Sequence, residues 1–144
     1  MVSSEAGPGR LRVGLERTDE FTVADRLLTD VGGSIAVSVL STPSMIAMME
    51  RNAARLSLEH LPPGKATVGF EVCVRHVAAA VEGAHCAVHA RLEEIVEGRK
   101  LRFSVRVSER AEDDGGEDRV IGLGTHERRV IDVAEHASRA AAAP

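Results

Sequence analysis

The chain has 144 residues, with a hydrophobic fraction of 44%, a charged fraction of 28% and a formal net charge of -4 at pH 7. This length allows one domain to bury a core without disulfides or a structural metal. The acidic balance and the near absence of aromatic residues, with three Phe and no Trp or Tyr, argue against nucleic-acid binding, which uses basic patches and aromatic stacking. We expect an aliphatic core.

The sequence also argues against secretion and membrane insertion. Residues 1–9 lack the apolar run of a signal peptide, and no later run approaches the roughly 20 apolar residues of a membrane span. We therefore expect a cytoplasmic protein without membrane association. Residues 1–9 resemble a flexible leader and the Ala-rich residues 137–144 a flexible tail, so a single domain is expected over residues 10–136.

The first half of the chain predicts a strand followed by a long helix. Residues 11–23 have a strand-like pattern, and Gly32–Gly33 marks a turn before an apolar stretch at 35–40. The helix is expected at 42–58, because Thr42-Pro43 is a favourable start and apolar residues then recur at helical spacing. Pro62-Pro63-Gly64 follows its end.

The second half predicts four consecutive strands, at 67–80, 85–96, 101–109 and 119–132. Short hairpin connections favour antiparallel neighbours, so these strands should form an antiparallel sheet packed on the helix. In the first of them, strict alternation would place Phe70 and His76 on one face and Gly69 and Cys73 on the other.

Cysteine and histidine spacing gives no metal-binding motif. Cys73 and Cys86 lie in apolar strand-like segments and are expected to be buried, reduced thiols. His85 and His89 differ by four residues, which on a strand separates them by about 13 Å. We therefore predict no metal site.

Three segments resemble the fluoroacetyl-CoA thioesterase-like branch of the hotdog acyl-CoA thioesterases. They are STPSMIAMME at 41–50, VGFEV with VRH across 68–76, and GTHER at 124–128. The resemblance implies an α+β fold, a single hotdog domain whose antiparallel sheet wraps around one long central helix. It also implies a homodimer, or a larger assembly built from it, whose sheets continue from one protomer to the next.

The same resemblance implies a set of site residues. Thr42, Glu50 and His76 would be catalytic, while Gly69 and Arg128 would line the acyl end of the site. Taken singly, each has a simpler interpretation: Thr42 as a helix N-cap, Glu50 as a solvated residue beside the apolar stripe, and His76 as a buried histidine.

Hydrolysis of a thioester needs a base or nucleophile, a stabilised oxyanion and a proton for the thiolate. Glu50 could activate water or attack the carbonyl itself, His76 could supply the proton, and the amides at the helix start could hold the oxyanion. The expected substrate is a small acyl group on coenzyme A or on a carrier protein, without metal or organic cofactor. A non-catalytic acyl-CoA-binding or sensing protein is the alternative.

Two features bear on the substrate. The fluoroacetate-specific member of the family covers its acyl group with phenylalanines ahead of the helix, whereas residues 32–40 contain no aromatic residue. Fluoroacetyl specificity is therefore not expected. The phosphates of coenzyme A would meet surface arginines, with Arg51, Arg55, Arg75 and Arg91 as candidates.

Overall fold

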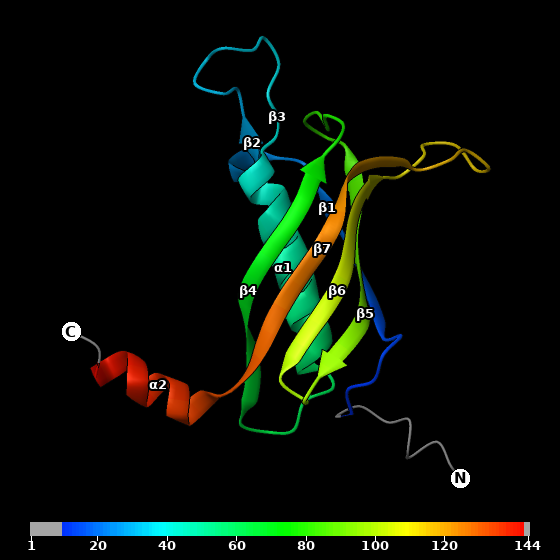
Figure 1. Ribbon diagram of the computed structural model, residues 1–144. Coiled ribbons are helices and arrows are strands. Elements are labelled where there is room, and N and C mark those ends of the chain that lie inside the picture. The colour runs from blue at the N-terminus through cyan, green and yellow to red at the C-terminus, as the bar shows by residue number, and fades with distance from the viewer. Residues whose placement is uncertain (1–9, 143–144) are drawn as a thin grey trace.

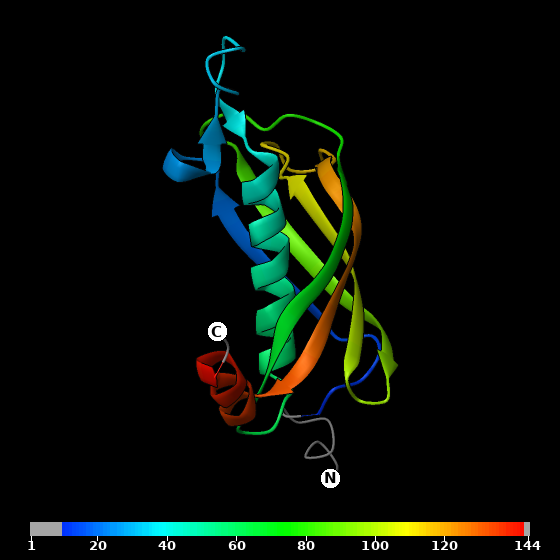
Figure 2. The same cartoon turned by 60° about the vertical axis from the view of Figure 1, so that its left-hand side comes forward.

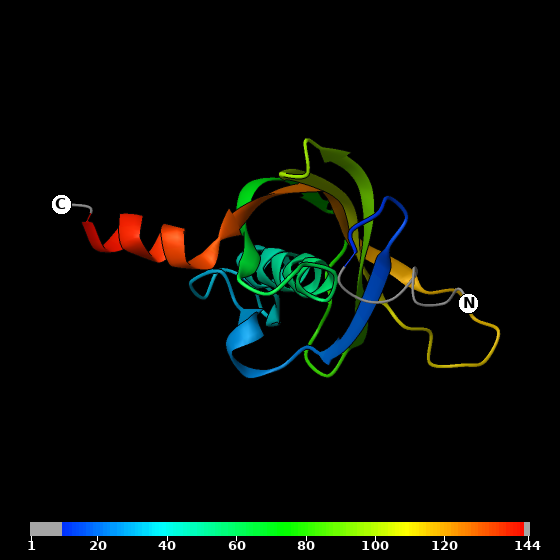
Figure 3. The same ribbon diagram turned by 90° about the horizontal axis from the view of Figure 1, so that it is seen from below.

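A computed structural model describes residues 10–142. One five-stranded antiparallel sheet, in the order β1-β5-β6-β7-β4, curves around the long helix α1 (Figure 1). Seen from below, α1 lies in the hollow of the sheet with β1 and β4 on either side (Figure 3). The principal elements are β1 (Glu16–Thr22), α1 (Thr42–Leu58), β4 (Lys65–His76), β5 (His85–Val96), β6 (Lys100–Glu109) and β7 (Arg119–Asp132). The predicted α+β hotdog architecture is confirmed.

The start of α1 differs from the prediction by one residue. Ser41, not Thr42, is the N-cap: its side chain accepts a hydrogen bond from the Ser44 amide at 3.1 Å. Thr42 and Pro43 then form the start of the helix, where the missing N–H of proline is harmless. Because Ser41 does the capping, the Thr42 hydroxyl is available for another partner.

The core lies between α1 and the concave face of the sheet. The apolar stripe of the helix packs against side chains that point inward from the central strands. The fully buried members include Met45, Met49, Ala53, Leu56, Leu92, Leu101, Phe103 and Val107. Gly122 of β7 lies under Met45, and a Cβ there would collide with the Met45 sulfur. This glycine therefore allows the helix to approach the sheet closely.

A β-bulge in β4 changes which side chains face the helix. Gly69 pairs with Arg128 and Glu71 with Glu127, so Phe70 is an extra residue between two regular stretches. Phe70 lies on the outer face, where the Arg129 guanidinium is 3.6 Å from its ring centre. Strict alternation was therefore the wrong prediction here, because the bulge brings Gly69 and His76 to the same inner face.

One peripheral segment also differs from the prediction. Residues 11–15 form a turn with Gly14 at φ 100°, so β1 begins only at Glu16. Of the apolar stretch at 35–40, only β3 (Val39–Leu40) is a strand, which pairs with β2 (Leu28–Thr29). The loop between them extends beyond the sheet (Figure 2).

Helix α2 (Val133–Ala142) crosses the predicted domain end at residue 136. Residues 137–142, expected to be a flexible tail, are helical, and none of the α2 side chains is buried. The predicted leader at 1–9 and the last two residues lie outside the described residues. No helix of residues 10–142 is long and apolar enough to cross a membrane.

Candidate active site

Thr42 and His76 form the first part of the candidate site. Thr42 is the first residue of α1 and His76 the last of β4, and the Thr42 Oγ1 lies 2.8 Å from His76 Nδ1. The other ring nitrogen, Nε2, is buried and has no hydrogen-bond partner among residues 10–142. Burial lowers the pKa of His76 below its ordinary value. The pair therefore holds an imidazole whose Nε2 has no partner within the described residues.

Glu50, Gly69 and Arg128 form the second part. Glu50 Oε2 lies 4.0 Å from Arg128 Nη1, and the Glu50 side chain is 41% exposed. Gly69 gives this carboxylate its space, because a Cβ at residue 69 would lie only 2.6 Å from Glu50 Oε2. The group that approaches Gly69 closely is therefore the Glu50 carboxylate.

Arg128 is held rigidly on the inner face of β7. Its Nε donates to Thr67 Oγ1 at 2.7 Å and its Nη2 to the Thr67 carbonyl at 3.0 Å. Its Nη1 lies 3.1 Å from His126 Nε2. Burial lowers the pKa of Arg128, while the nearby charge of Glu50 raises it. The result is a buried, oriented cation that faces a partly exposed carboxylate.

His126 is a site residue that the sequence analysis did not single out. It is 2% exposed, and its Nδ1 lies 2.8 Å from the Glu71 carbonyl, directly after the bulge. A carbonyl oxygen only accepts, so Nδ1 carries the proton and Nε2 accepts from Arg128. The GTHER segment contains His126, but the resemblance assigned a role only to its arginine, Arg128.

We expect the fold to lose stability as the pH falls below about 6.5, the ordinary histidine value. Burial, and then the charge of Arg128, lowers the pKa of His126 in spite of the Glu71 hydrogen bond. A group whose pKa is lower in the folded state than in the unfolded state stabilises the fold at a pH above its unfolded-state pKa. This stabilisation is lost as the pH falls through the folded-state pKa. Melting temperatures of wild type and His126→Asn between pH 7.5 and 5 measure this effect.

As the pH is lowered, the melting temperature of His126→Asn should fall less steeply than that of wild type, because the variant lacks the titrating group of His126. His76 contributes a fall of the same sign and remains in both proteins. His136→Asn, on the exposed helix α2, should keep the wild-type slope. Equal slopes for wild type and His126→Asn would contradict the assignment.

The two parts of the site are separate within one chain. Thr42 and Glu50 are eight residues apart on α1, which corresponds to about 12 Å along the helix axis. Most amides of the first turn are not free for the predicted oxyanion hole. Pro43 has no N–H, the Ser44 amide bonds to the Ser41 side chain and the Met45 amide to the Ser41 carbonyl.

The remaining candidate ligands have other roles. His85 and His89 bind Glu20 and Glu16 of β1 at 2.7 and 2.8 Å. Within the described part of the chain, no group of three or more His, Cys, Asp or Glu side chains is placed to hold a metal ion. Cys86 is buried, which raises its thiol pKa to about 11.

The prediction for Cys73 was wrong, because this thiol is exposed. It lies after the bulge, where odd-numbered residues of β4 face outward.

Comparison with known proteins extends these observations. The model of the fluoroacetyl-CoA-specific thioesterase family, FlK, matches residues 23–134. A fluoroacetyl-CoA thioesterase from Streptantibioticus cattleyicolor is 39% identical over 93 residues, or 65% of this chain. That match spans 61% of the relative's length.

Solved structures of thioesterases are also similar to this protein, over most of its chain. A structure of the fluoroacetyl-CoA thioesterase FlK has a TM-score of 0.74 and 31% identity, covering 93% of this chain and 98% of its own. A thioesterase superfamily member from Thermus thermophilus has a TM-score of 0.74 and 25% identity, covering 89% of both chains.

A hot-dog-like protein from Thermanaerovibrio acidaminovorans shares the fold at 22% identity, with a TM-score of 0.75 over 97% of this chain and 95% of its own. The family match, the identity to the curated relative and the structural similarity agree with the three sequence segments identified above. This chain belongs to the fluoroacetyl-CoA-specific thioesterase family and has a hotdog fold.

Proposed function

We propose that the protein hydrolyses a small acyl-CoA, or the same acyl group on a carrier protein, with Glu50, His76 and Thr42 as catalytic residues. The observation that carries this proposal is the Glu50 carboxylate, which is partly exposed beside Gly69 and 4.0 Å from the buried Arg128 guanidinium. Family membership supports the thioester as substrate. The reaction uses protein groups alone, with coenzyme A as part of the substrate, and we expect it in the cytoplasm.

In the proposed reaction, Glu50 accepts a proton from water while the water oxygen attacks the thioester carbonyl. Arg128 stabilises the negative charge on the tetrahedral intermediate. When the C–S bond breaks, the Nε2–H of His76 donates a hydrogen bond to the departing sulfur, and Thr42 donates its hydroxyl hydrogen to Nδ1 to keep the Nε2–H form. The proton that Glu50 took from water passes to the thiolate, so that Glu50 and His76 return to their starting states. Direct attack by Glu50, with an anhydride that water then hydrolyses, is the other route.

We further propose that the working form is a homodimer. Strand β4 is at the edge of the sheet and, within the described residues, pairs only with β7. An unpaired edge can bind the same edge of a second copy. Because Thr42 and Glu50 are about 12 Å apart along α1, a second protomer that joins the two parts would complete the site.

Mixed dimers test this arrangement. A dimer of one Glu50→Gln chain and one His76→Ala chain contains one intact site if the two residues come from different protomers, and none if they come from the same one. We expect about half of the wild-type activity per dimer in the first case. An inactive mixed dimer would contradict a shared site.

The reaction itself is tested by thiol release from acyl-CoA thioesters. The panel contains acetyl to decanoyl, fluoroacetyl, malonyl and phenylacetyl esters, and we expect release from short acyl groups. Fluoroacetyl-CoA should have no special advantage over acetyl-CoA, since residues 32–40 contain no aromatic residue. If acyl-CoA binds tightly, but no acyl thioester of coenzyme A or of a carrier protein is hydrolysed, the result would instead favour the non-catalytic binding or sensing protein.

A further inference from the structure

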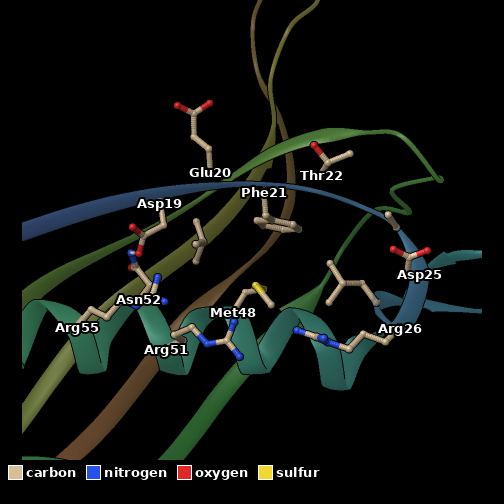
Figure 4. Close-up of a pocket in the computed structure, with 13 residues that line it drawn as sticks. Asp19, Glu20, Phe21, Thr22, Asp25, Arg26, Met48, Arg51, Asn52 and Arg55 are labelled. Atoms are coloured by element: carbon tan, nitrogen blue, oxygen red, sulfur yellow. Dashed lines mark hydrogen bonds between the residues drawn. The ribbon is translucent and has the colours of Figure 1, made fainter.

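A cavity of about 350 Å³ lies between β1 and α1. Figure 4 shows α1 along one side and β1 along the other. Successive helix residues turn by about 100°, so Arg51 and Asn52 point away from the side of α1 that carries Glu50. The cavity is therefore distinct from the candidate active site, on the opposite flank of the same helix.

The floor of this cavity is apolar and includes one buried amide. Phe21, Met48 and Val88 supply the apolar surface, and Val88 is only 3% exposed. Asn52 is 1% exposed, and its Nδ2 donates to the Arg17 carbonyl and to Asp19. Its Oδ1 has no hydrogen-bond partner within residues 10–142. An unsatisfied buried acceptor at a cavity wall is uncommon and suits a ligand with a donor group.

Three arginines surround the cavity: Arg26, Arg51 and Arg55. In the described part of the chain none of them forms an ion pair with a carboxylate. The side chains of Arg26 and Arg51 extend toward one another over Met48 (Figure 4). Facing guanidinium groups repel each other, and an anion between them would remove that repulsion.

Three carboxylates also line this cavity, those of Asp19, Glu20 and Asp25. Asp19 is committed to Arg17 and Asn52. Glu20 points away from the helix in Figure 4 and pairs with His85. Asp25 lies on the rim beside Arg26 (Figure 4), and among the described residues it forms no ion pair with an arginine of the cavity. The cavity thus combines three arginines that have no ion-pair partner with an apolar floor.

We propose that this cavity binds a phosphorylated small molecule with a flat apolar part, of the nucleotide class. Guanidinium groups bind phosphate through paired, charge-assisted hydrogen bonds. A planar base fits against Phe21 and Met48, and an amino hydrogen of the base could reach Asn52 Oδ1. The nucleotide half of coenzyme A has this chemistry, and so does a free nucleotide. Only the assignment to coenzyme A rests on the proposed function.

Calorimetry with ADP as the probe tests the cavity without any turnover. We expect wild type to bind ADP and the double variant Arg51→Gln/Arg55→Gln to bind it at least about tenfold more weakly, because two charge-assisted contacts are lost. Arg12→Gln/Arg106→Gln removes the same charge from exposed positions outside this cavity and should keep wild-type affinity. Circular dichroism confirms that each variant is folded.

Absence of ADP binding to wild type, or equal weakening in both double variants, would overturn the proposal. Kinetics then identify the source of the nucleotide. If ADP competes with acyl-CoA, and the cavity variant raises KM for acyl-CoA but not for the corresponding acyl-pantetheine, the nucleotide is that of the substrate. If ADP binds without competing, it is a separate ligand. If no thioester is hydrolysed, the proposed function fails while the calorimetry still decides the cavity.

Discussion

Replacing Glu50 with Gln should lower kcat for thiol release by about 10²- to 10⁴-fold, the usual contribution of a general base. The amide has nearly the shape of the carboxylate but can neither accept the proton nor attack the carbonyl. KM should change little, since the side chain is 41% exposed and contributes little to the walls of the site. Steady-state kinetics on the best ester of the panel measure both constants.

Glu59→Gln is a suitable control. Glu59 follows the last residue of α1 and pairs with Arg17 at 2.6 Å, away from Arg128. This variant removes the same charge and should keep wild-type kcat. If Glu50→Gln also retains wild-type kcat on a confirmed substrate, Glu50 is neither base nor nucleophile.

Gly69→Ala should reduce kcat/KM by about 10²-fold, the cost of misplacing a catalytic group by about 1 Å. The new Cβ would lie 2.6 Å from Glu50 Oε2, so the carboxylate must move. The distances from the new Cβ to the side chains of Arg128 and His126, 3.5 and 3.7 Å, are ordinary van der Waals contacts. The melting temperature should therefore change little, because the displaced carboxylate is the end of a flexible side chain.

A double-mutant cycle tests how Gly69 acts. If the methyl group acts through the carboxylate, adding Gly69→Ala to Glu50→Gln should cost almost nothing further. Independent, multiplicative losses would show that residue 69 acts on the substrate directly. Gly116→Ala, in the exposed turn before β7, controls for a methyl group added elsewhere and should leave kcat/KM unchanged.

The long elements of the fold could be predicted from sequence because each carries a strong periodic signal. Strands β5 and β7 have the predicted bounds, and α1 ends where predicted, ahead of the Pro-Pro-Gly turn. Residues 11–15 were harder to predict, since their alternating pattern continues through Gly14, which turns the chain. Ser41 and Thr42 are adjacent and both carry a hydroxyl group, so the sequence does not show which of them caps α1. The backbone geometry decides that Ser41 is the cap.

The site was predictable only in part. The resemblance identified Thr42 and His76, which the structure brings within 2.8 Å, and it identified Glu50, Gly69 and Arg128, which it gathers on the other side of the bulge. The role of His126 could not be predicted, because it depends on the Glu71 carbonyl, presented by a bulge that is visible only when β4 is paired with β7.

The extra residue, Phe70, also determines which positions of β4 tolerate substitution. Before it, the odd-numbered positions 67 and 69 face the helix, and after it the even-numbered positions 72, 74 and 76 do so. A substitution scan along β4 should therefore show sensitive positions every second residue, with the parity reversing at Phe70. Deleting Phe70 would restore one uninterrupted alternation and would still leave Gly69 and His76 on the inner face, because the two residues would then be an even number of positions apart.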